Sequence, residues 1–453
     1  MQTTSIHGMW SSRLAFILAA TGSAVGLGNI WRFPYVTSDN GGGAFVLIYL
    51  GCILLVGLPI MWTEIVIGRR GRMSPINSLR ELSDDAGASR KWMGIGFLGV
   101  IAGFLILSFY SVVAGWTLHY GFLYLKDLFG GATITDPDAT FGSLLAQPGE
   151  LAFWHGLFMV MTVSVVAFGV EKGLERAVSI LMPLLFVLLL VLLGYGMNTG
   201  YFLEAAGFLF KPDWSQVSGA MIVTAMGQAF FTLSLGMCAI MTYGAYLPSG
   251  VNIPRVGVTV AATDTVVALV AGLAIFPIVI SFGLDPAGGG PGLIFTSLPL
   301  AFAEMPFGIL YGFLFFTLLS VAAWTSGISL MEPATAYIVE ATNLSRKAAA
   351  ICVAAVAWMM GLASVFSFNV WSEVRIGGLE VMDAIVYVAN DVMLPVGGLL
   401  TAVFGGWVLS SRITHEELDK KMPDWAYNAW LWVTRIVTPA LILVVLAGLF
   451  GII

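Results

Sequence analysis

Two stretches of the sequence place glycine and hydroxyl residues in the middle of apolar runs, where a continuous membrane helix would avoid them. The first is Gly22-Ser-Ala-Val-Gly-Leu-Gly-Asn29, which is followed by Arg32 and Pro34. The second is Gly227-Gln-Ala-Phe-Phe-Thr-Leu-Ser-Leu-Gly-Met-Cys238. Backbone N–H and C=O groups stranded in hydrocarbon are costly, so such a break persists only where a substrate, ions or polar side chains satisfy them.

The chemistry of a broken helix is specific. Freed carbonyl groups suit a hard cation such as Na+, and the exposed amide end of a half-helix suits a carboxylate. The alternative is close packing without any break, because the four-residue spacing of Gly22 and Gly26 lets two helices approach each other. A dinucleotide fingerprint is excluded, because no strand precedes Gly26 and Gly28.

A few ionisable side chains lie inside apolar runs, where an unpaired charge is expensive and normally faces a partner or a watery cavity. They are Arg32, Glu64, Asp264, Asp383 and Asp391. Asp264 is either a cation ligand or a structural carboxylate held by hydrogen bonds.

The adjacent hydroxyl residues Thr325 and Ser326 have two interpretations as well. They line one side of an oxygen cage, or they bond the carbonyl groups of the preceding helical turn.

The composition excludes a soluble globular protein. Of 453 residues, 58% are hydrophobic and 10% charged, and the mean hydropathy is +0.92. A soluble domain has about 25% charged residues. The net charge of -6 offers no basic surface to nucleic acid, and the scattered three cysteines and four histidines indicate neither a disulfide framework nor a metal cluster. No nucleophile–base pair is visible, so the sequence does not indicate an enzyme.

The apolar runs predict eleven membrane helices. We place them at 12–37, 43–69, 92–126, 152–170, 176–199, 216–243, 255–283, 307–340, 346–365, 380–410 and 425–451. Lys and Arg residues fall mostly on the side of the N-terminus, which predicts a cytoplasmic N-terminus in a plasma or bacterial inner membrane. An odd number of spans then places the C-terminus outside.

The spans divide into a repeat plan. Residues 1–11 form a cytoplasmic segment, residues 12–199 and 216–410 form two five-helix repeats, and residues 425–451 form the eleventh helix. The first and sixth spans then hold corresponding positions, and interrupted spans in corresponding positions of two halves indicate a transporter site at the bilayer midplane.

Three motifs carry a resemblance to a known family. The run from Gly22 to Pro34 with Asn40-Gly-Gly-Gly-Ala-Phe, the run from Gln228 to Gly236, and Thr325-Ser-Gly-Ile-Ser-Leu-Met-Glu-Pro resemble the neurotransmitter:sodium symporter family, in order along nearly the whole chain. The chain looks like a bacterial amino acid:sodium symporter of the leucine-transporter type. The resemblance implies an all-α polytopic fold of two inverted five-helix repeats, with helices 1 and 6 broken, and sodium-coupled import of a small amino acid or related zwitterion by alternating access.

The resemblance also implies two sodium sites. One uses the Ala24 carbonyl, Asn29, Thr232 and Asp264 together with the substrate carboxylate; the other uses the Gly22, Val25 and Ala322 carbonyls with Thr325 and Ser326. Asp264 supplies a fixed negative charge where chloride-dependent relatives use a bound anion, so chloride independence is expected.

The substrate site carried over from the family pairs Tyr110 and the Gly26 and Leu27 amides with a carboxylate, and Ser234 and the Phe231 carbonyl with an amino group. The complete expected set is Ser23, Ala24, Gly26, Leu27, Ile106, Tyr110, Phe231, Thr232, Ser234, Met237, Cys238, Ser329 and Leu330. Arg32 and Phe231 resemble parts of an outer gate, with Asp383 preferred to Asp391 as the partner of Arg32, although the local pattern departs from that of the family.

Cys238 is a second departure, because many amino-acid carriers have Gly-x-Gly at this break. A side chain there narrows the pocket and resembles carriers of GABA, taurine or betaine, and Ser23 and Ser329 make the pocket more polar. An α-amino acid is the default expectation, and these substrates are the alternative. A channel or sodium-gated sensor on the same scaffold is the remaining alternative, although no repeated pore ring or signalling domain is visible.

Overall fold

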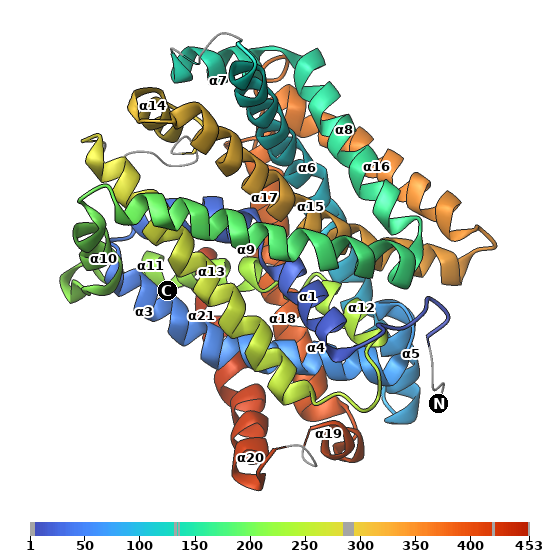
Figure 1. The fold of residues 1–453 in the computed structure, drawn as a ribbon. Coiled ribbons are helices and arrows are strands. Elements are labelled where there is room, and N and C mark those ends of the chain that lie inside the picture. The colour runs from blue at the N-terminus through green and yellow to red at the C-terminus, as the bar shows by residue number, and fades with distance from the viewer. Residues whose placement is uncertain (1–4, 131–133, 135, 284–293, 419–421, 452–453) are drawn as a thin grey trace.

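The computed structural model describes residues 5–130, 134, 136–283, 294–418 and 422–451, so residues 1–4 of the expected N-terminal segment lie outside the described residues. The described chain is built from helices and one short hairpin (Figure 1). The helices up to the sixth span are α1 (Arg13–Ala24), α2 (Phe33–Asp39), α3 (Gly43–Cys52), α4 (Leu58–Gly71), α5 (Pro75–Asp85), α6 (Gly94–Leu128), α7 (Pro137–Ala146), α8 (Pro148–Val166), α9 (Arg176–Met197), α10 (Phe202–Phe210), α11 (Gly219–Thr232) and α12 (Ala239–Ala245).

The second half of the chain contains the longest continuous spans and the hairpin. Its elements are α13 (Ile253–Ser281), α14 (Ser297–Glu304), α15 (Gly308–Ala341), α16 (Arg346–Ser367), β1 (Arg375–Ile376), β2 (Leu379–Glu380), α17 (Val381–Val386), α18 (Leu394–Val403), α19 (Ser411–Glu417), α20 (Asp424–Trp432) and α21 (Thr438–Leu449). Strands β1 and β2 pair antiparallel, with Arg375 opposite Glu380.

Short π-helical turns join several of these helices into longer spans. They are η1 (Gly28–Arg32), η2 (Ile53–Gly57), η4 (Val170–Glu175), η8 (Tyr387–Met393), η9 (Phe404–Val408) and η11 (Val433–Val437), and 3-10 turns form η3 (Arg90–Met93) and η5 (Trp214–Gln216). Turns of this kind are frequent at functional sites.

Nine helices among the described residues are long and apolar enough to cross a membrane, and the bent pair 13–24 and 28–39 makes a tenth. The sixth predicted span is divided into α11 and α12, which completes the eleven. The two spans that are not continuous helices are therefore the first and the sixth, as the glycine-rich runs predict.

The breaks follow from local backbone conformation. The two parts of the first span are bent by 48°, after Val25 leaves the helical conformation. Between α11 and α12, positive φ angles occur at Ser234 (53°), Gly236 (77°) and Cys238 (61°). Residues other than glycine rarely adopt this left-handed backbone conformation, because it costs roughly 1–2 kcal/mol per residue. The surrounding packing must therefore hold the break in place.

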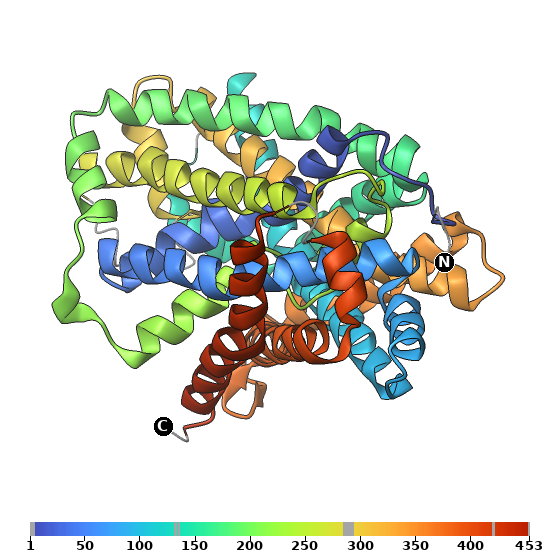
Figure 2. The ribbon, with the colours of Figure 1, turned by 90° about the horizontal axis from the view of Figure 1, so that it is seen from below.

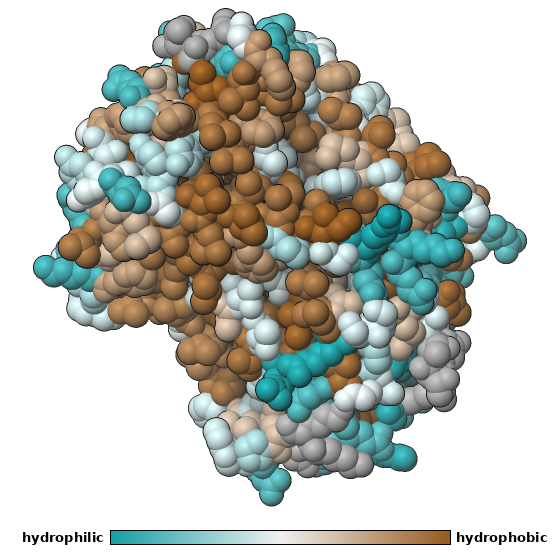
Figure 3. Space-filling model, viewed as in Figure 1, coloured by the Kyte–Doolittle hydropathy of each residue, from teal (hydrophilic) through white to brown (hydrophobic). Residues whose placement is uncertain are grey.

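The broken helices lie inside the bundle. Helix α1 contacts α9, α12, α13 and α15, while α6 and α15 pack along each other. Helices α9 and α13 run side by side, and the C-terminal helices α20 and α21 lie at the periphery (Figure 2). Brown apolar side chains cover the middle of one face, with hydrophilic ones toward its right edge and bottom (Figure 3). Such a surface suits contact with lipid.

Candidate functional site

A small cavity is enclosed by four parts of the structure: the break in the first span, the break in the sixth span, helix α6 and helix α15. Eleven residues line it: Ser23, Ala24, Gly26, Gly28, Ile106, Tyr110, Phe231, Ser234, Met237, Ser326 and Leu330. Most of the substrate residues expected from the sequence are therefore together. Leu27, Thr232, Cys238 and Ser329 do not line it, and Gly28 and Ser326 are additions.

The broken first helix directs hydrogen-bond donors toward the cavity. The Leu27 amide donates to the Tyr110 hydroxyl at 3.3 Å, so this amide is close to the ring expected to bind a carboxylate. Gly26 allows the approach: a Cβ atom there would fall 2.3 Å from Ser326 Oγ and 2.9 Å from Tyr110 Oη. Only glycine fits at this position without displacing both side chains.

Serine side chains form the polar part of the site. Ser23 Oγ donates to Ser329 Oγ at 2.8 Å, and Ser234 Oγ donates to the Ser23 carbonyl at 2.8 Å. The Ser234 amide bonds the Phe231 carbonyl at 3.2 Å. Ser329 therefore lies behind Ser23, where it positions a lining residue.

Cys238 points away from the cavity. Its Sγ lies 4.0 Å from the Ile95 carbonyl, and a Cβ atom on Gly99 would meet it at 2.4 Å. The thiol therefore fills space next to α6 behind the unwound segment. The expected narrowing of the pocket by this side chain is not a direct contact in the structure, because the positive φ of Cys238 turns its Cβ outward from the lining residues.

One cluster of oxygen ligands centres on Asp264, which is fully buried. Its carboxylate accepts from Asn29 Nδ2 at 2.7 Å and from Thr232 Oγ1 at 3.1 Å. Asn29 Oδ1 in turn accepts the Gly26 amide at 3.0 Å. The Asn29 and Thr232 side chains of the first predicted ion site thus both bond the Asp264 carboxylate, while Ala24, the fourth predicted member, lines the cavity.

A second cluster joins α1 to α15. Ser326 Oγ lies 3.4 Å from the Gly22 carbonyl and 3.5 Å from the Val25 carbonyl, and Thr325 Oγ1 lies 3.0 Å from the Ala322 carbonyl. This is the oxygen set predicted for the second ion site. Carbonyl and hydroxyl oxygens are the ligands that hard cations prefer, so both clusters fit Na+.

Arg32 lies against the ring of Phe231, which lines the cavity. The Arg32 guanidinium lies 5.1 Å from the centre of the Phe231 ring and 3.5 Å, through Nη1, from the Gly227 carbonyl. Asp391 is a tenth-span acid within electrostatic range of Arg32. Asp383 is exposed in the first turn of α17, whereas Asp391 lies two helical turns further into the span. The structure therefore favours Asp391 as the acid of the gate.

Two polar side chains that the sequence does not assign to the site stabilise the breaks. Glu64 Oε1 accepts the Gly236 amide at 2.8 Å, and Gln228 Nε2 donates to the Gly28 carbonyl at 2.8 Å. Both are fully buried. The signal for them is a polar residue in an apolar span, which normally requires a specific partner.

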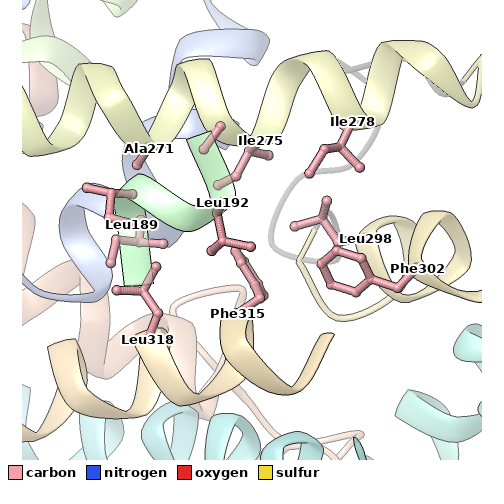
Figure 4. A pocket seen from close by; sticks show the side chains of 11 residues that line it. Leu189, Leu192, Ala271, Ile275, Ile278, Leu298, Phe302, Phe315 and Leu318 are labelled. Carbon is pink, nitrogen blue, oxygen red and sulfur yellow. The ribbon is translucent and has the colours of Figure 1, made fainter. Parts of the chain in front are cut away.

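A second small cavity lies between α9, α13, α14 and α15 (Figure 4). Its lining is entirely apolar and includes Leu192, Ile275, Phe302 and Phe315. With no polar side chain in the lining, it offers nothing to the charged ends of a zwitterion.

Known proteins show the same arrangement. The profile of the Sodium:neurotransmitter symporter family matches residues 7–131 and 139–451. The uncharacterized sodium-dependent transporter YhdH of Bacillus subtilis is 36% identical, covering 98% of each chain. A taurine transporter from rat, described as sodium- and chloride-dependent, is 27% identical over 68% of this chain and 57% of its own length.

A solved relative matches in three dimensions as well. The crystal structure of MhsT in complex with L-phenylalanine superposes with a TM-score of 0.89, at 44% identity, covering 97% of this chain and 99% of MhsT. The broken first and sixth spans, the family profile over nearly the whole chain and the full-length relatives agree. The chain therefore belongs to the sodium:neurotransmitter symporter family, whose members are transporters and not enzymes.

Proposed function

We propose that this transporter couples sodium entry to the import of an α-amino acid with an apolar side chain, by alternating access. One observation carries the proposal: the Tyr110 hydroxyl, which accepts the Leu27 amide, lines a cavity whose remaining wall includes Ile106, Met237 and Leu330. The polar end suits the backbone of an amino acid, and the apolar wall suits its side chain.

The spacing of polar groups favours an α-amino acid. In such a substrate the carboxylate and ammonium share one carbon, so its donors and acceptors must be neighbours. The Gly26 and Leu27 amides lie within three residues of the Ala24 carbonyl, and Ser234 of the other break donates to the neighbouring Ser23 carbonyl. GABA and taurine carry their charges farther apart, and betaine has no N–H to donate to Ser234. The MhsT complex contains an α-amino acid.

The two oxygen clusters are proposed as the sodium sites. Sodium at Asp264 would neutralise a buried carboxylate and adjoin the substrate carboxylate, while sodium at Ser326 would tie α1 to α15. Ion and substrate then stabilise each other, and this coupling is reciprocal. Because Asp264 carries its own negative charge, we propose that transport needs no chloride.

We also propose that the N-terminus faces the cytoplasm of a plasma or bacterial inner membrane, as the distribution of Lys and Arg indicates. Arg32, Phe231 and Asp391 then form the outer gate. The repeat boundaries at 12–199 and 216–410 stay predictions of the sequence.

Uptake into proteoliposomes tests the function. We expect a sodium gradient to drive accumulation of radiolabelled leucine. Unlabelled leucine, alanine and tryptophan should compete with this uptake, whereas GABA and taurine should compete weakly or not at all. Replacing chloride by gluconate at constant sodium should leave uptake unchanged. Equal uptake in a potassium gradient would overturn the coupling, preferential inhibition by taurine would overturn the substrate class, and loss of uptake in gluconate would overturn chloride independence.

A further inference from the structure

Arg435 is a cation within the last membrane span, Asp424–Leu449, and it is not among the residues that line the cavity between the helix breaks. No carboxylate of the described residues comes within ion-pair distance of its guanidinium. A charged side chain in a span is expensive unless it has a partner, and it is by default a candidate functional site.

The contacts of Arg435 come from the end of the tenth span. Its Nε donates to the Gly406 carbonyl at 2.6 Å, and its guanidinium lies 5.2 Å from the centre of the Trp407 ring. Trp407 Nε1 donates back to the Arg435 carbonyl at 3.3 Å. A Cβ atom on Gly406 would fall 2.9 Å from Arg435 Cγ, so the glycine makes room for the arginine stem. The guanidinium is therefore held in one place by the Gly406 carbonyl and the Trp407 ring, which surround it.

This surround uses little of the binding capacity of the side chain. A guanidinium carries five N–H donors, and the one on Nε is bonded to Gly406. The four N–H groups on the two Nη atoms have no protein acceptor among the described residues. A planar fork of this kind matches the oxygen atoms of a phosphate group.

The position in the membrane identifies the source of the phosphate. Gly406 lies in the last turn of the span Val381–Val408, about 3 Å from its end at 1.5 Å per residue. Trp407 and Trp432 are 63% and 57% exposed, as expected for indoles at the headgroup level. Beyond them, α21 exposes Leu443 and Val444 toward the hydrocarbon. The arginine and the two indoles thus lie where a lipid headgroup would be, and the exposed apolar side chains of α21 lie where its acyl chains would be.

We propose that Arg435, seated on Gly406 and against Trp407, binds the phosphate of an anionic phospholipid whose acyl chains lie along α21. In the orientation proposed above, this lipid belongs to the inner leaflet. A basic group between membrane helices near the interface is suited to such headgroups.

Native mass spectrometry of the purified full-length transporter tests the site. Protein that has been freed of bound lipid by washing in detergent is titrated with phosphatidylglycerol, phosphatidylcholine or inorganic phosphate. We expect the first phosphatidylglycerol to bind about tenfold more tightly than phosphatidylcholine. Arg435→Gln should abolish this preference. Arg412→Gln, which removes an exposed cation paired with Glu416, should retain it.

Two further variants separate lipid binding from folding. Gly406→Ala keeps the charge but displaces the arginine stem, and Trp407→Leu removes the ring contact. Each variant should weaken phosphatidylglycerol binding several-fold. The melting temperature of the lipid-free protein reports whether the variant is folded. The proposal is overturned if Arg435→Gln, Gly406→Ala and Trp407→Leu all keep the wild-type preference for phosphatidylglycerol over phosphatidylcholine. Competition by inorganic phosphate at lipid-like concentrations would instead indicate a free-anion site, and lipid-excluding dimers of the wild type would indicate a protein interface; either result also overturns it.

Discussion

Gly26 is the residue at which the site leaves least space. The Cβ of a Gly26→Ala variant would overlap Ser326 Oγ and crowd Tyr110 Oη, at 2.3 and 2.9 Å. Overpacking costs roughly 1–3 kcal/mol, so we expect sodium-dependent leucine binding to weaken by about five- to 150-fold in a scintillation proximity assay. Gly51→Ala is the matched control, because no atom lies within 4 Å of its added Cβ. Equal loss in both variants would contradict the argument.

Asp264 is the residue on which the proposed charge balance depends. In Asp264→Ala, Asn29 and Thr232 lose their shared acceptor and the proposed ion site loses the carboxylate at its centre. We expect the sodium concentration for half-maximal leucine binding to rise at least about tenfold, because a charged partner is removed from a buried site. Glu373→Ala, at an exposed loop position, should behave like wild type. Unchanged sodium dependence of Asp264→Ala would refute the assignment.

Residue types in apolar spans single out these positions as candidates, but side-chain directions do not follow from sequence. Asp264, Thr325 and Ser326 stand out as polar groups that hydrocarbon would not tolerate alone. Cys238 shows the limit: its positive φ turns the thiol toward Gly99, and no sequence pattern specifies that angle. Asp383 and Asp391 are likewise two helical turns apart, and the electrostatic contact of Asp391 with Arg32 follows from the folded structure and not from the spacing of the two acids.

At the scale of elements, the sixth-span break depends on a side chain from another helix. Glu64 of α4 accepts the Gly236 amide between α11 and α12. Glu64→Ala leaves that buried N–H without its acceptor, at a cost of about 1–3 kcal/mol.

We expect the melting temperature of Glu64→Ala in detergent to fall by a few degrees, together with lower leucine binding. Glu81→Ala, an exposed position on α5, provides the control. A wild-type melting temperature for Glu64→Ala would show that the break is held by other contacts.

Long spans are predictable because apolar length alone identifies them. The predicted helix 92–126 corresponds to the observed span Arg90–Leu128. The predicted helix 216–243 is instead α11 and α12 with an irregular segment between them, which the central glycine and serine residues indicate without defining its ends. The π-helical turns have no comparable signal, because a single extra residue in a helical turn leaves apolar periodicity nearly intact.

At the scale of the molecule, Glu340 at the end of α15 ties together three distant segments. Its carboxylate accepts from His7 Nε2 at 2.8 Å, the Ser74 amide at 2.6 Å and Asn77 Nδ2 at 2.6 Å. This cluster joins the N-terminal segment, α5 and α15 on one face of the bundle.

Glu340→Ala should release the N-terminal segment, because His7 Nε2, the Ser74 amide and hydroxyl, and Asn77 Nδ2 all lose the same acceptor. We expect faster hydrogen–deuterium exchange in residues 5–12 by mass spectrometry. Glu150→Ala removes the carboxylate next to His119 near the opposite ends of the helices and should leave residues 5–12 unchanged. Similar exchange in both variants would mean that the cluster does not hold this segment.

Ser326 has a consequence for handling the protein. Its hydroxyl lies 3.3 to 3.5 Å from the Gly22, Ser23 and Val25 carbonyls, yet one hydrogen can be donated to one carbonyl at a time. Ser234 Oγ donates to the Ser23 carbonyl, so the Ser326 hydroxyl is left to satisfy only one of the Gly22 and Val25 carbonyls at a time. In a buffer without sodium, these two oxygens repel each other across the bend of the first helix. Purification and storage in potassium or choline salts should therefore shorten the active lifetime of the transporter, and sodium added before detergent extraction should preserve it.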